Sequence, residues 1–403
     1  MWPHGKASSA AVQDCGVRAG VSVIVAAVAL SLCAETAPAQ TAPTVTTNLP
    51  SWRAPGGSLA LRGTAAPGAA VELWIGAAKR ADTTAEPDGD YAFGVRVPAT
   101  PRTYVVAVVS GGQRTEAGRV LVRPVRLSAV GDVNLGDGVA TAMARHGTRW
   151  PWLYVASRLR TADIAVVNLE CTVSTRGRAW PGKLFTFRGT PASLRTTRTF
   201  AGIDVASLAN NHSLDYGRVA FADTLAYAKR YGIRTIGGGA NLMQARKPAI
   251  LLRGGLKIAF LGFAEERPAA FDAGPGRSGL TPAAPAYIRA DVRQARQNAD
   301  VVVVYFHWGV ELDRTPNARE RMLAQVSLDA GASVVLGAHP HVLQPRVRQG
   351  NRFIAWSLGN FVFDWTSPGT DRTGILRLGL DADGVATSSF LPARINWVQP
   401  RPQ

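Results

Sequence analysis

The chain has 403 residues and a formal net charge of +17, with 45 Lys and Arg residues against 28 Asp and Glu residues. A charge of this size favours a polyanionic partner, such as an anionic cell-wall polymer or an anionic lipid surface. The sequence has no dense basic run, basic helix or recognised nucleic-acid motif, so nucleic acid is not expected as a partner.

Residues 1–39 are predicted to be a signal peptide that is removed from the mature protein. Basic residues precede the apolar stretch Val21–Leu32, and the small-x-small pattern Ala37–Ala39 follows it. The apolar stretch is short for a permanent membrane span. We therefore expect secretion to the periplasm or the cell surface. A lipid anchor on Cys33 is the less favoured alternative, because a bulky leucine precedes this cysteine.

Removal of that segment leaves Cys171 as the single cysteine, so no internal disulfide can form. Stability must then come from burial of a core, for which the remaining length suffices. Cys171 follows Glu170 directly, and strand alternation is expected to turn its side chain away from any site at Glu170. We predict that Cys171 is a small buried hydrophobe. No permanent transmembrane helix is expected after the signal peptide.

Two domains are predicted after a Pro- and Thr-rich linker at 40–48. In 49–124, short alternating strands such as Ser58–Arg62 and Ala70–Ile75 are separated by turn signals. This spacing predicts a small immunoglobulin-like β-sandwich that serves for spacing or surface attachment.

The second predicted domain, 125–397, alternates strands with helices. Helical spacing is present in 151–161, 217–231, 287–298 and 317–330. Hairpin signals occur at Arg253–Gly255 and Gln349–Asn351, and the tail 374–397 is expected to be all-β. The fold class is therefore α/β (α+β), with two packed sheets flanked by helices.

Five apolar runs of this domain end in groups that can bind a metal. Because ligands collect at the carboxyl ends of strands in α/β sheets, we expect these groups to converge. His339 and His341 form a His-x-His pair, and both rings share one face if this segment is extended. Pro340 between them stiffens the backbone of the segment. Carboxylate, amide and imidazole groups of this kind are the ligands of metal-dependent hydrolases. The predicted metal ligands are Asp132, Glu170, Asn211, His212, His307, His339 and His341.

Six motifs in order resemble the CapA family of capsule synthesis proteins, which is associated with poly-gamma-glutamate capsules. The resemblance spans Val125 to Asn396. It implies similarity to calcineurin-like metallophosphatases, with a four-layer α-β-β-α fold and two metals, and it places the predicted ligands at ligand or catalytic positions. The motifs are Gly131–Gly136, Asn168–Glu170, Asn210–His212, Phe306–Glu311, Gly337–Gln344 and Ser357–Phe361.

Two positions depart from the metallophosphatase pattern. Asn134 stands where those enzymes have the histidine of an Asp-x-His motif, and Glu170 belongs to Asn-Leu-Glu instead of Gly-Asp-x-x-Asp. The chain is therefore expected to bind one or two divalent metals, the second held loosely by Glu170. Oxygen ligands favour Mn²⁺ or Mg²⁺, and the histidines also allow Zn²⁺ or Fe.

Catalytic roles are assigned to His212 and His307, by proton transfer or stabilisation of charge, and to Glu311. Glu311 could transfer a proton or orient His307, and we favour the orienting role. A Ser213–Asp215 triad with His212 is discarded, because residues this close in sequence rarely meet that geometry. The predicted substrate-binding residues are Asn134, Lys183, Arg188 and Asn360. Lys183 and Arg188 could instead belong to a solvated hairpin, and Asn360 could instead cap a turn.

Two hypotheses for function follow. The first is a secreted metal-dependent hydrolase that acts on phosphoester or gamma-glutamyl amide bonds in the synthesis, export or processing of a capsule polymer. The second is a non-catalytic accessory factor that binds a polyanion, either poly-gamma-glutamate or another cell-wall polymer. For both, the resemblance implies a membrane-bound capsule synthase complex as a partner, and fold alone does not decide between them.

Overall fold

The computed structural model describes residues 41–364 and 367–403. The predicted signal peptide lies outside the described residues. Within them, no helix has the length and apolar character needed to cross a membrane. Cys171 is fully buried and unbonded to another cysteine, as predicted.

Two small sheets follow one another at the start of the described chain. Their orders are β1-β3-β6 and β2-β8-β7-β4-β5, and their inward residues, such as Leu61 and Val108, form one core cluster. β1 lies inside the predicted linker and pairs with β3, so this part of the linker belongs to a sheet. The immunoglobulin-like assignment stays a prediction. The strands are β1 Thr44–Val45, β2 Trp52–Arg53, β3 Ser58–Thr64, β4 Ala70–Ile75, β5 Ala78–Thr84, β6 Asp90–Arg96, β7 Thr103–Ser110 and β8 Gln113–Val122.

An eight-stranded sheet has the order β14-β13-β10-β9-β24-β25-β26, with β23 also paired to β9. The first four strands are mutually parallel, whereas β24, β25 and β26 are antiparallel to their neighbours. The predicted domain end at residue 397 is wrong, because β26 continues this sheet beyond it. The strands are β9 Val125–Val133, β10 Ile164–Leu169, β13 Val205–Ser207, β14 Arg234–Ile236, β23 Asn360–Val362, β24 Arg372–Asp381, β25 Gly384–Asn396 and β26 Gln399–Pro402.

A six-stranded sheet has the order β16-β17-β19-β20-β22-β21. Its four central strands are parallel, and the two edge strands belong to the hairpins predicted around Arg253–Gly255 and Gln349–Asn351. The strands are β16 Ala249–Arg253, β17 Leu256–Ala264, β19 Val301–His307, β20 Val334–Ala338, β21 Arg346–Gln349 and β22 Arg352–Ala355. The pairs β11 Thr172–Val173 with β12 Arg188–Gly189, and β15 Gly238–Gly239 with β18 Gly279–Leu280, complete the strands.

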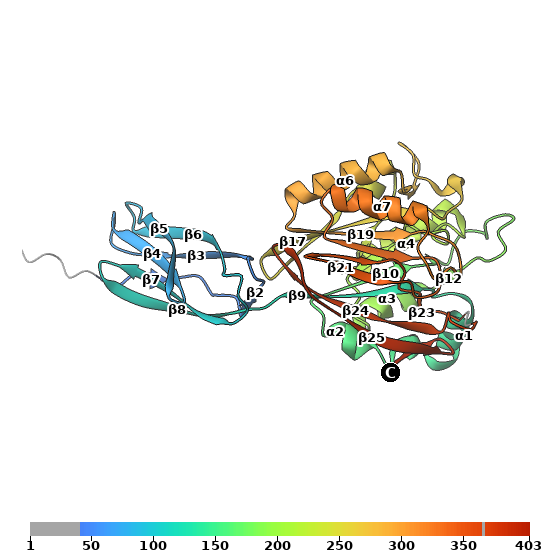
Figure 1. Cartoon of the computed structure of the whole chain (residues 1–403), viewed down its shortest axis with the longest axis horizontal. Coiled ribbons are helices and arrows are strands. Elements are labelled where there is room, and N and C mark those ends of the chain that lie inside the picture. The colour runs from blue at the N-terminus through green and yellow to red at the C-terminus, as the bar shows by residue number, and fades with distance from the viewer. Residues whose placement is uncertain (1–40, 365–366) are drawn as a thin grey trace, which may run out of the picture. The chain divides into compact units, whose positions relative to one another are not determined.

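Helices cover the outer face of each large sheet, which gives the predicted α-β-β-α order of four layers. Figure 1 shows α6 and α7 over one sheet and α1 and α2 at the opposite side of the domain. The prediction of one helix over 151–161 is wrong, because a 3₁₀ turn and a short helix occupy these residues. The helices predicted over 217–231, 287–298 and 317–330 are confirmed as α4, α6 and α7. The helices are α1 Asp137–His146, η1 Trp150–Trp152, α2 Ala156–Arg160, α3 Pro191–Thr199, α4 Gly217–Tyr231, α5 Leu242–Arg246, η2 Ala269–Phe271, α6 Pro285–Asn298 and α7 Ala318–Asp329.

Strand alternation divides the core into three layers. In β19, Val301, Val303 and Tyr305 pack between the two sheets, while Val302 and Val304 pack under α6 and α7. The period of two residues explains this split. Because the inner side of each central strand faces another sheet and the outer side faces helices, these strands are apolar on both faces.

A β-bulge interrupts β9 just before its end. Ala129 pairs with Val166 and Asp132 pairs with Asn168, so three residues of β9 match two of β10. A bulge shifts the phase of alternation. Tyr305 of the opposite sheet donates a 2.7 Å hydrogen bond from its hydroxyl to the carbonyl oxygen of Val130 inside the bulge.

Replacement of Tyr305 by Phe tests the importance of this hydrogen bond. Both partners are fully buried, so the free energy of unfolding should fall by about 1–3 kcal/mol, the cost of an unsatisfied buried carbonyl. Urea denaturation measures the change. Tyr227→Phe on α4 serves as the matched control and should change stability by less than about 0.5 kcal/mol. Equal effects of both substitutions would contradict a role for the bulge contact.

Candidate metal centre

Three strands of the two large sheets direct polar side chains into the space between the sheets. In β10, Ile164 and Val166 face the other sheet, and the same alternation carries Asn168 and Glu170 to that side. In β19 the inward series ends at His307. Each of these three polar residues is fully buried. Alternation therefore explains why the ends of β10 and β19 meet.

Asp132 reaches the same space because of the bulge. Ala129 packs between the sheets, so strict alternation would put Asp132 on the helical side. The extra residue reverses the phase, and Val133 packs on the helical side instead. Asn168 Nδ2 then donates to Asp132 Oδ1 at 2.8 Å. Asp132 Oδ2 accepts the backbone N–H of His339 at 3.3 Å.

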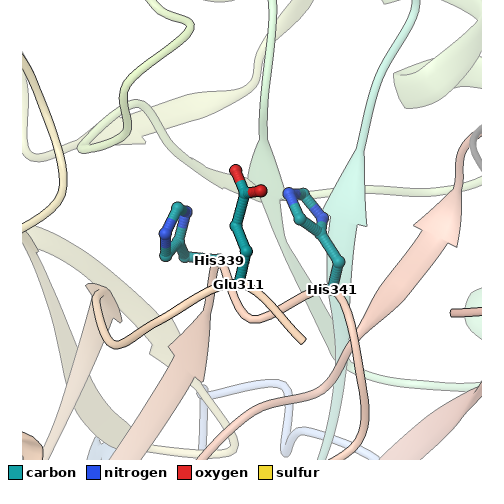
Figure 2. A group of neighbouring side chains, drawn as sticks. All are labelled: Glu311, His339 and His341. Carbon is teal, nitrogen blue, oxygen red and sulfur yellow. The ribbon is translucent and has the colours of Figure 1, made fainter. Parts of the chain in front are cut away.

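The two histidines after β20 lie on a turn with an unusual backbone. His339 and His341 have φ angles of 97° and 58°, in the left-handed region that non-glycine residues seldom adopt. The segment is therefore not extended, and strand alternation is not what brings the two rings to one face. Both rings nevertheless point to one side, and Glu311 stands between them (Figure 2). Backbone strain of this kind concentrates at functional sites.

Asn210 connects the loop after β13 to β10. Its Nδ2 donates to Asn168 Oδ1 at 3.1 Å and to the carbonyl oxygen of Leu169 at 2.8 Å. Its Oδ1 accepts the backbone N–H of His212 at 3.0 Å. Asn211, the next residue, lies with its Oδ1 2.9 Å from His307 Nε2. Asn168 and Asn210 are not among the predicted site residues, although each belongs to one of the six motifs, which is a usable signal.

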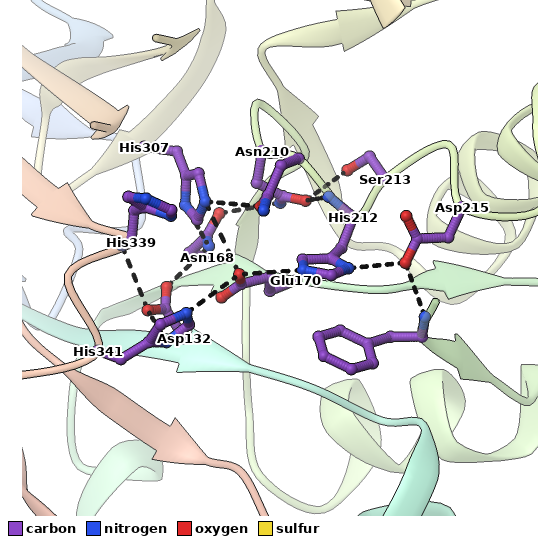
Figure 3. A network of polar contacts seen from close by, with 12 residues as sticks. Asp132, Asn168, Glu170, Asn210, His212, Ser213, Asp215, His307, His339 and His341 are labelled. Atoms are coloured by element: carbon purple, nitrogen blue, oxygen red, sulfur yellow. Dashed lines mark hydrogen bonds and ion pairs between the residues drawn. The ribbon is translucent and has the colours of Figure 1, made fainter. Parts of the chain in front are cut away.

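Glu170 occupies the centre of the cluster (Figure 3). Its Oε1 lies 3.9, 3.7 and 3.9 Å from Nε2 of His212, His307 and His341. Among the described residues, neither carboxylate oxygen of Glu170 has a hydrogen-bond partner. Three imidazole nitrogens therefore surround a buried carboxylate without satisfying it.

The electrostatics of the cluster favour a positive guest. Burial, followed by the negative charge of Asp132, raises the pKa of Glu170 well above its ordinary value. Burial, followed by the neighbouring His339, lowers the pKa of His307 well below its ordinary value. Burial also lowers the pKa of His339 to about 3. Burial thus favours the neutral form of His307 and His339, whereas contacts with Asp132 and Asn360 raise the pKa of His341 against the effect of its burial.

These residues fit a divalent cation. Asp132, Glu170 and His341 can each offer a ligand atom, and these atoms lie within 4.8 Å of one another. The unpartnered oxygens of Glu170 are the atoms that a cation would satisfy. Carboxylate and imidazole donors suit Mn²⁺, Zn²⁺ or Fe²⁺.

A second cluster flanks the centre at His212. Its Nδ1 lies 2.7 Å from Asp215 Oδ2, and its ring stacks on Phe187 with centroids 4.0 Å apart. Lys183 forms an ion pair with Asp215 and lies 3.0 Å from His212 Nδ1. Ser213 Oγ instead bonds to Leu208 and Asn210. Ser213 therefore does not contact His212 through its hydroxyl, which agrees with the rejection of the triad, whereas Asp215 does contact His212.

Two further predicted site residues, Glu311 and Asn360, lie beside the histidines of the loop after β20. The orienting role for Glu311 is wrong, because the ring nitrogens of His307 contact Asn168 and Asn211, while the exposed Glu311 lies with His339 and His341. Asn360 Oδ1 is 2.7 Å from His341 Nδ1. Its role in substrate binding stays a prediction.

Two more predicted substrate-binding residues are engaged within the protein. The Arg188 guanidinium lies 3.5 Å from the ring centroid of Tyr216 and donates to the carbonyl oxygen of Gly177. Asn134 is fully buried, and its Oδ1 accepts the backbone N–H of Gly136 at 2.7 Å. Contact of either residue with a substrate stays a prediction.

Comparison with known proteins places this centre in context. Residues 126–365 match the family described as "Bacterial capsule synthesis protein PGA_cap". The chain is 32% identical over 279 residues to the PGA biosynthesis protein CapA of Bacillus subtilis (strain 168), covering 68% of this chain and 73% of that protein. It is 32% identical over 306 residues to the capsule biosynthesis protein CapA of Bacillus anthracis, covering 72% and 73%.

Among solved structures, a 5'-nucleotidase precursor from Thermus thermophilus aligns with 12% identity and a TM-score of 0.39. That alignment covers 67% of this chain and 54% of the solved chain, about half of its length.

Glu170→Gln tests the metal centre directly. The substitution keeps the size of the side chain and removes the central charge, so the protein purified without chelator should contain at least one divalent cation per chain fewer than the unaltered protein. Elemental analysis gives the count. The control is His146→Asn, because His146 stacks on Trp150 away from the cluster. Unchanged metal content in Glu170→Gln would contradict the assignment.

Proposed function

Because this chain belongs to the bacterial capsule synthesis protein PGA_cap family, we propose that it is a metal-dependent hydrolase acting in poly-gamma-glutamate capsule synthesis, export or processing. The observation that carries the proposal is the buried cluster around Glu170, where three imidazole nitrogens surround an unsatisfied carboxylate. A merely structural cluster of buried polar groups would be expected to satisfy its own hydrogen bonds.

A bound divalent cation would supply Lewis-acid polarisation of a phosphoryl or amide oxygen. Asp132, Glu170, Asn211, His307, His339 and His341 would hold it. His212 is placed for proton transfer, because Asp215 contacts its Nδ1 and leaves Nε2 directed at the cluster. Stacking on Phe187 fixes the ring plane. The pair therefore provides an oriented acid–base group.

The proposed substrate is an anionic polymer, cut at a gamma-glutamyl amide or a phosphoester. Two relatives carry capsule or PGA biosynthesis in their names, and the net charge of +17 favours association with such a polymer. Lys183 stands beside His212, and burial lowers the pKa of its ammonium while the carboxylate of Asp215 opposes this. An anionic substrate group close to Lys183 would stabilise its charged form.

The proposal places the protein outside the cytoplasmic membrane. It rests on the signal-peptide pattern of residues 1–39, with the capsule polymer and a membrane-bound capsule synthase complex as partners. A lipid anchor on Cys33 remains the less favoured form of attachment.

A second candidate function is a non-catalytic accessory factor that binds the polymer. The net positive charge favours it, as does the position of Asn134, whose amide oxygen is used within its own turn where a metallophosphatase has a histidine ligand. In this case the cation would act in binding alone.

The hydrolase proposal predicts a large loss of turnover in His212→Asn. Loss of an oriented proton-transfer group should lower kcat by roughly 10²–10⁴-fold. The metal content should stay close to that of the unaltered protein. Release of glutamate oligomers from poly-gamma-glutamate and hydrolysis of phosphoesters, each with added Mn²⁺, provide the assays. His146→Asn controls for loss of a remote imidazole. Full turnover in His212→Asn would refute the assigned role.

The accessory proposal predicts binding that depends on salt. Affinity for poly-gamma-glutamate should weaken by roughly tenfold or more between about 0.05 M and 0.5 M NaCl, because screening removes charge attraction. Sedimentation or fluorescence anisotropy with labelled polymer measures this. A neutral polysaccharide of similar length is the control ligand. Binding to both polymers with no salt dependence, or to neither, would exclude this second candidate.

A further inference from the structure

We propose that an arginine-lined pocket at the start of β24 is a subsite that binds a carboxylate of an anionic polymer, apart from the bond that is cut. This inference rests on the proposed function and deepens it, since it gives the polymer a second point of attachment. The pocket has a volume of about 460 Å³, and its lining includes Gly369, Asp371, Arg372 and Arg394.

The pocket lies at the same edge of the eight-stranded sheet as the metal centre. β24 is antiparallel to β9, with Leu376 paired to Ala129, so the start of β24 lies near the end of β9. β23 pairs with that end of β9 at Asp132 and also contacts β24. Asn360, the first residue of β23, has its Oδ1 2.7 Å from His341 Nδ1. One short strand therefore separates the centre from the start of β24.

The two arginines of the pocket also leave the sheet on the side that the metal centre uses. Leu376 and Leu378 of β24 pack between the two large sheets. Arg372 stands an even number of residues before them, so alternation directs its side chain to the same side. Arg394 of β25 is paired directly with Arg372, and residues opposite each other in an antiparallel pair share a face. Asp132 of the metal centre points to this side as well.

The pocket carries more positive than negative charge. Arg394 forms an ion pair with Asp371 at 2.9 Å, and Asp371 also accepts the backbone N–H of Gly369 at 3.2 Å. Arg372 is exposed, and within residues 41–364 and 367–403 its side chain has no ion pair or hydrogen bond. Like charges placed directly opposite each other destabilise a sheet. Arg372 therefore costs the fold free energy and is available to an anionic ligand.

A third arginine borders the pocket from the loop that follows β19. The guanidinium of Arg314 lies against Gly369 so closely that a Cβ at Gly369 would collide with it. Gly369 has a φ angle of 99°, in the left-handed region that glycine tolerates. Arg314 belongs to the same loop as Glu311, whose carboxylate lies with His339 and His341. This loop therefore extends from the metal centre to the wall of the pocket.

Guanidinium groups bind carboxylates through two parallel hydrogen bonds, a geometry that matches the planar fork of arginine. Poly-gamma-glutamate repeats a carboxylate at every unit. When one amide of the polymer lies at the metal centre, a carboxylate further along the chain can reach Arg372. The pocket contact would then strengthen binding of long chains and would not take part in bond cleavage. A short fragment would occupy the metal centre without reaching the pocket.

Arg372→Gln tests the subsite and leaves the ion pair of Arg394 with Asp371 in place. In the full-length protein loaded with Mn²⁺, the Kd for long poly-gamma-glutamate should rise roughly fivefold or more, because a charge-assisted contact is lost. Binding of a gamma-glutamyl dipeptide should not change. Fluorescence anisotropy with labelled polymer and competition by the dipeptide give both values. Urea denaturation should show no loss of stability, because the substitution removes a like-charge pair.

Arg234→Gln is the matched control. Arg234 is an exposed arginine at the start of β14, at the opposite edge of the same sheet, where β14 begins beside Val205. This variant loses the same charge and should bind the polymer as the unaltered protein does. An equal weakening in both variants would overturn the inference, because binding would then follow net charge alone.

Unchanged affinity in Arg372→Gln would also overturn the subsite, as would absence of polymer binding by the unaltered protein. A loss of stability that accompanies weaker binding would show that Arg372 serves the fold instead. A poly(glycerol phosphate) whose affinity depends more strongly on Arg372 than that of poly-gamma-glutamate would replace the carboxylate polymer by a phosphate polymer. These measurements do not depend on turnover. Hydrolysis of the polymer with unchanged affinity in Arg372→Gln would refute the subsite alone, and a working subsite without hydrolysis would refute the hydrolase proposal alone.

Discussion

Two buried carboxylates of like charge are the constraint to which the rest of the site is fitted. Asp132 and Glu170 are fully buried, and their ligand atoms lie within 4.8 Å of each other and of His341. At an effective dielectric constant of about 20, two such charges repel by roughly 3–4 kcal/mol. Burial favours the neutral form of His307 and His339, so these two rings do not cancel this charge. A divalent cation does, so metal binding and the stability of the folded site are expected to be linked.

The asparagines form the frame that keeps these carboxylates and histidines in place. Asn168 bridges Asp132 to His307, and Asn210 ties Asn168 to the loop that carries His212. Amide side chains donate and accept at once, so they can join a carboxylate to an imidazole without adding charge. Second-layer contacts of this kind commonly determine the orientation of metal ligands.

The cluster also explains why one centre is compatible with both candidate functions. A cation held at Asp132 and Glu170 would attract an anionic polymer, and the pair of His212 and Asp215 would provide the oriented proton-transfer group that cleavage needs. Binding requires the first feature, whereas hydrolysis requires both. The difference between an accessory factor and an enzyme therefore lies at His212, and the metal ligands alone cannot distinguish them.

The sequence by itself determined the layers and which strand ends carry the polar residues of the buried cluster. Alternation along β10 and β19 is a local property, so it predicts that Glu170 and His307 share a side while Cys171 turns away. Tertiary structure alone decided the direction of Asp132, because the bulge in β9 depends on pairing with β10 and on Tyr305 of the other sheet. The same holds for Glu311 and Asp215. Contacts between loops distant in sequence, or turns within a loop, leave no periodic signal, and they arise only when the two sheets pack together.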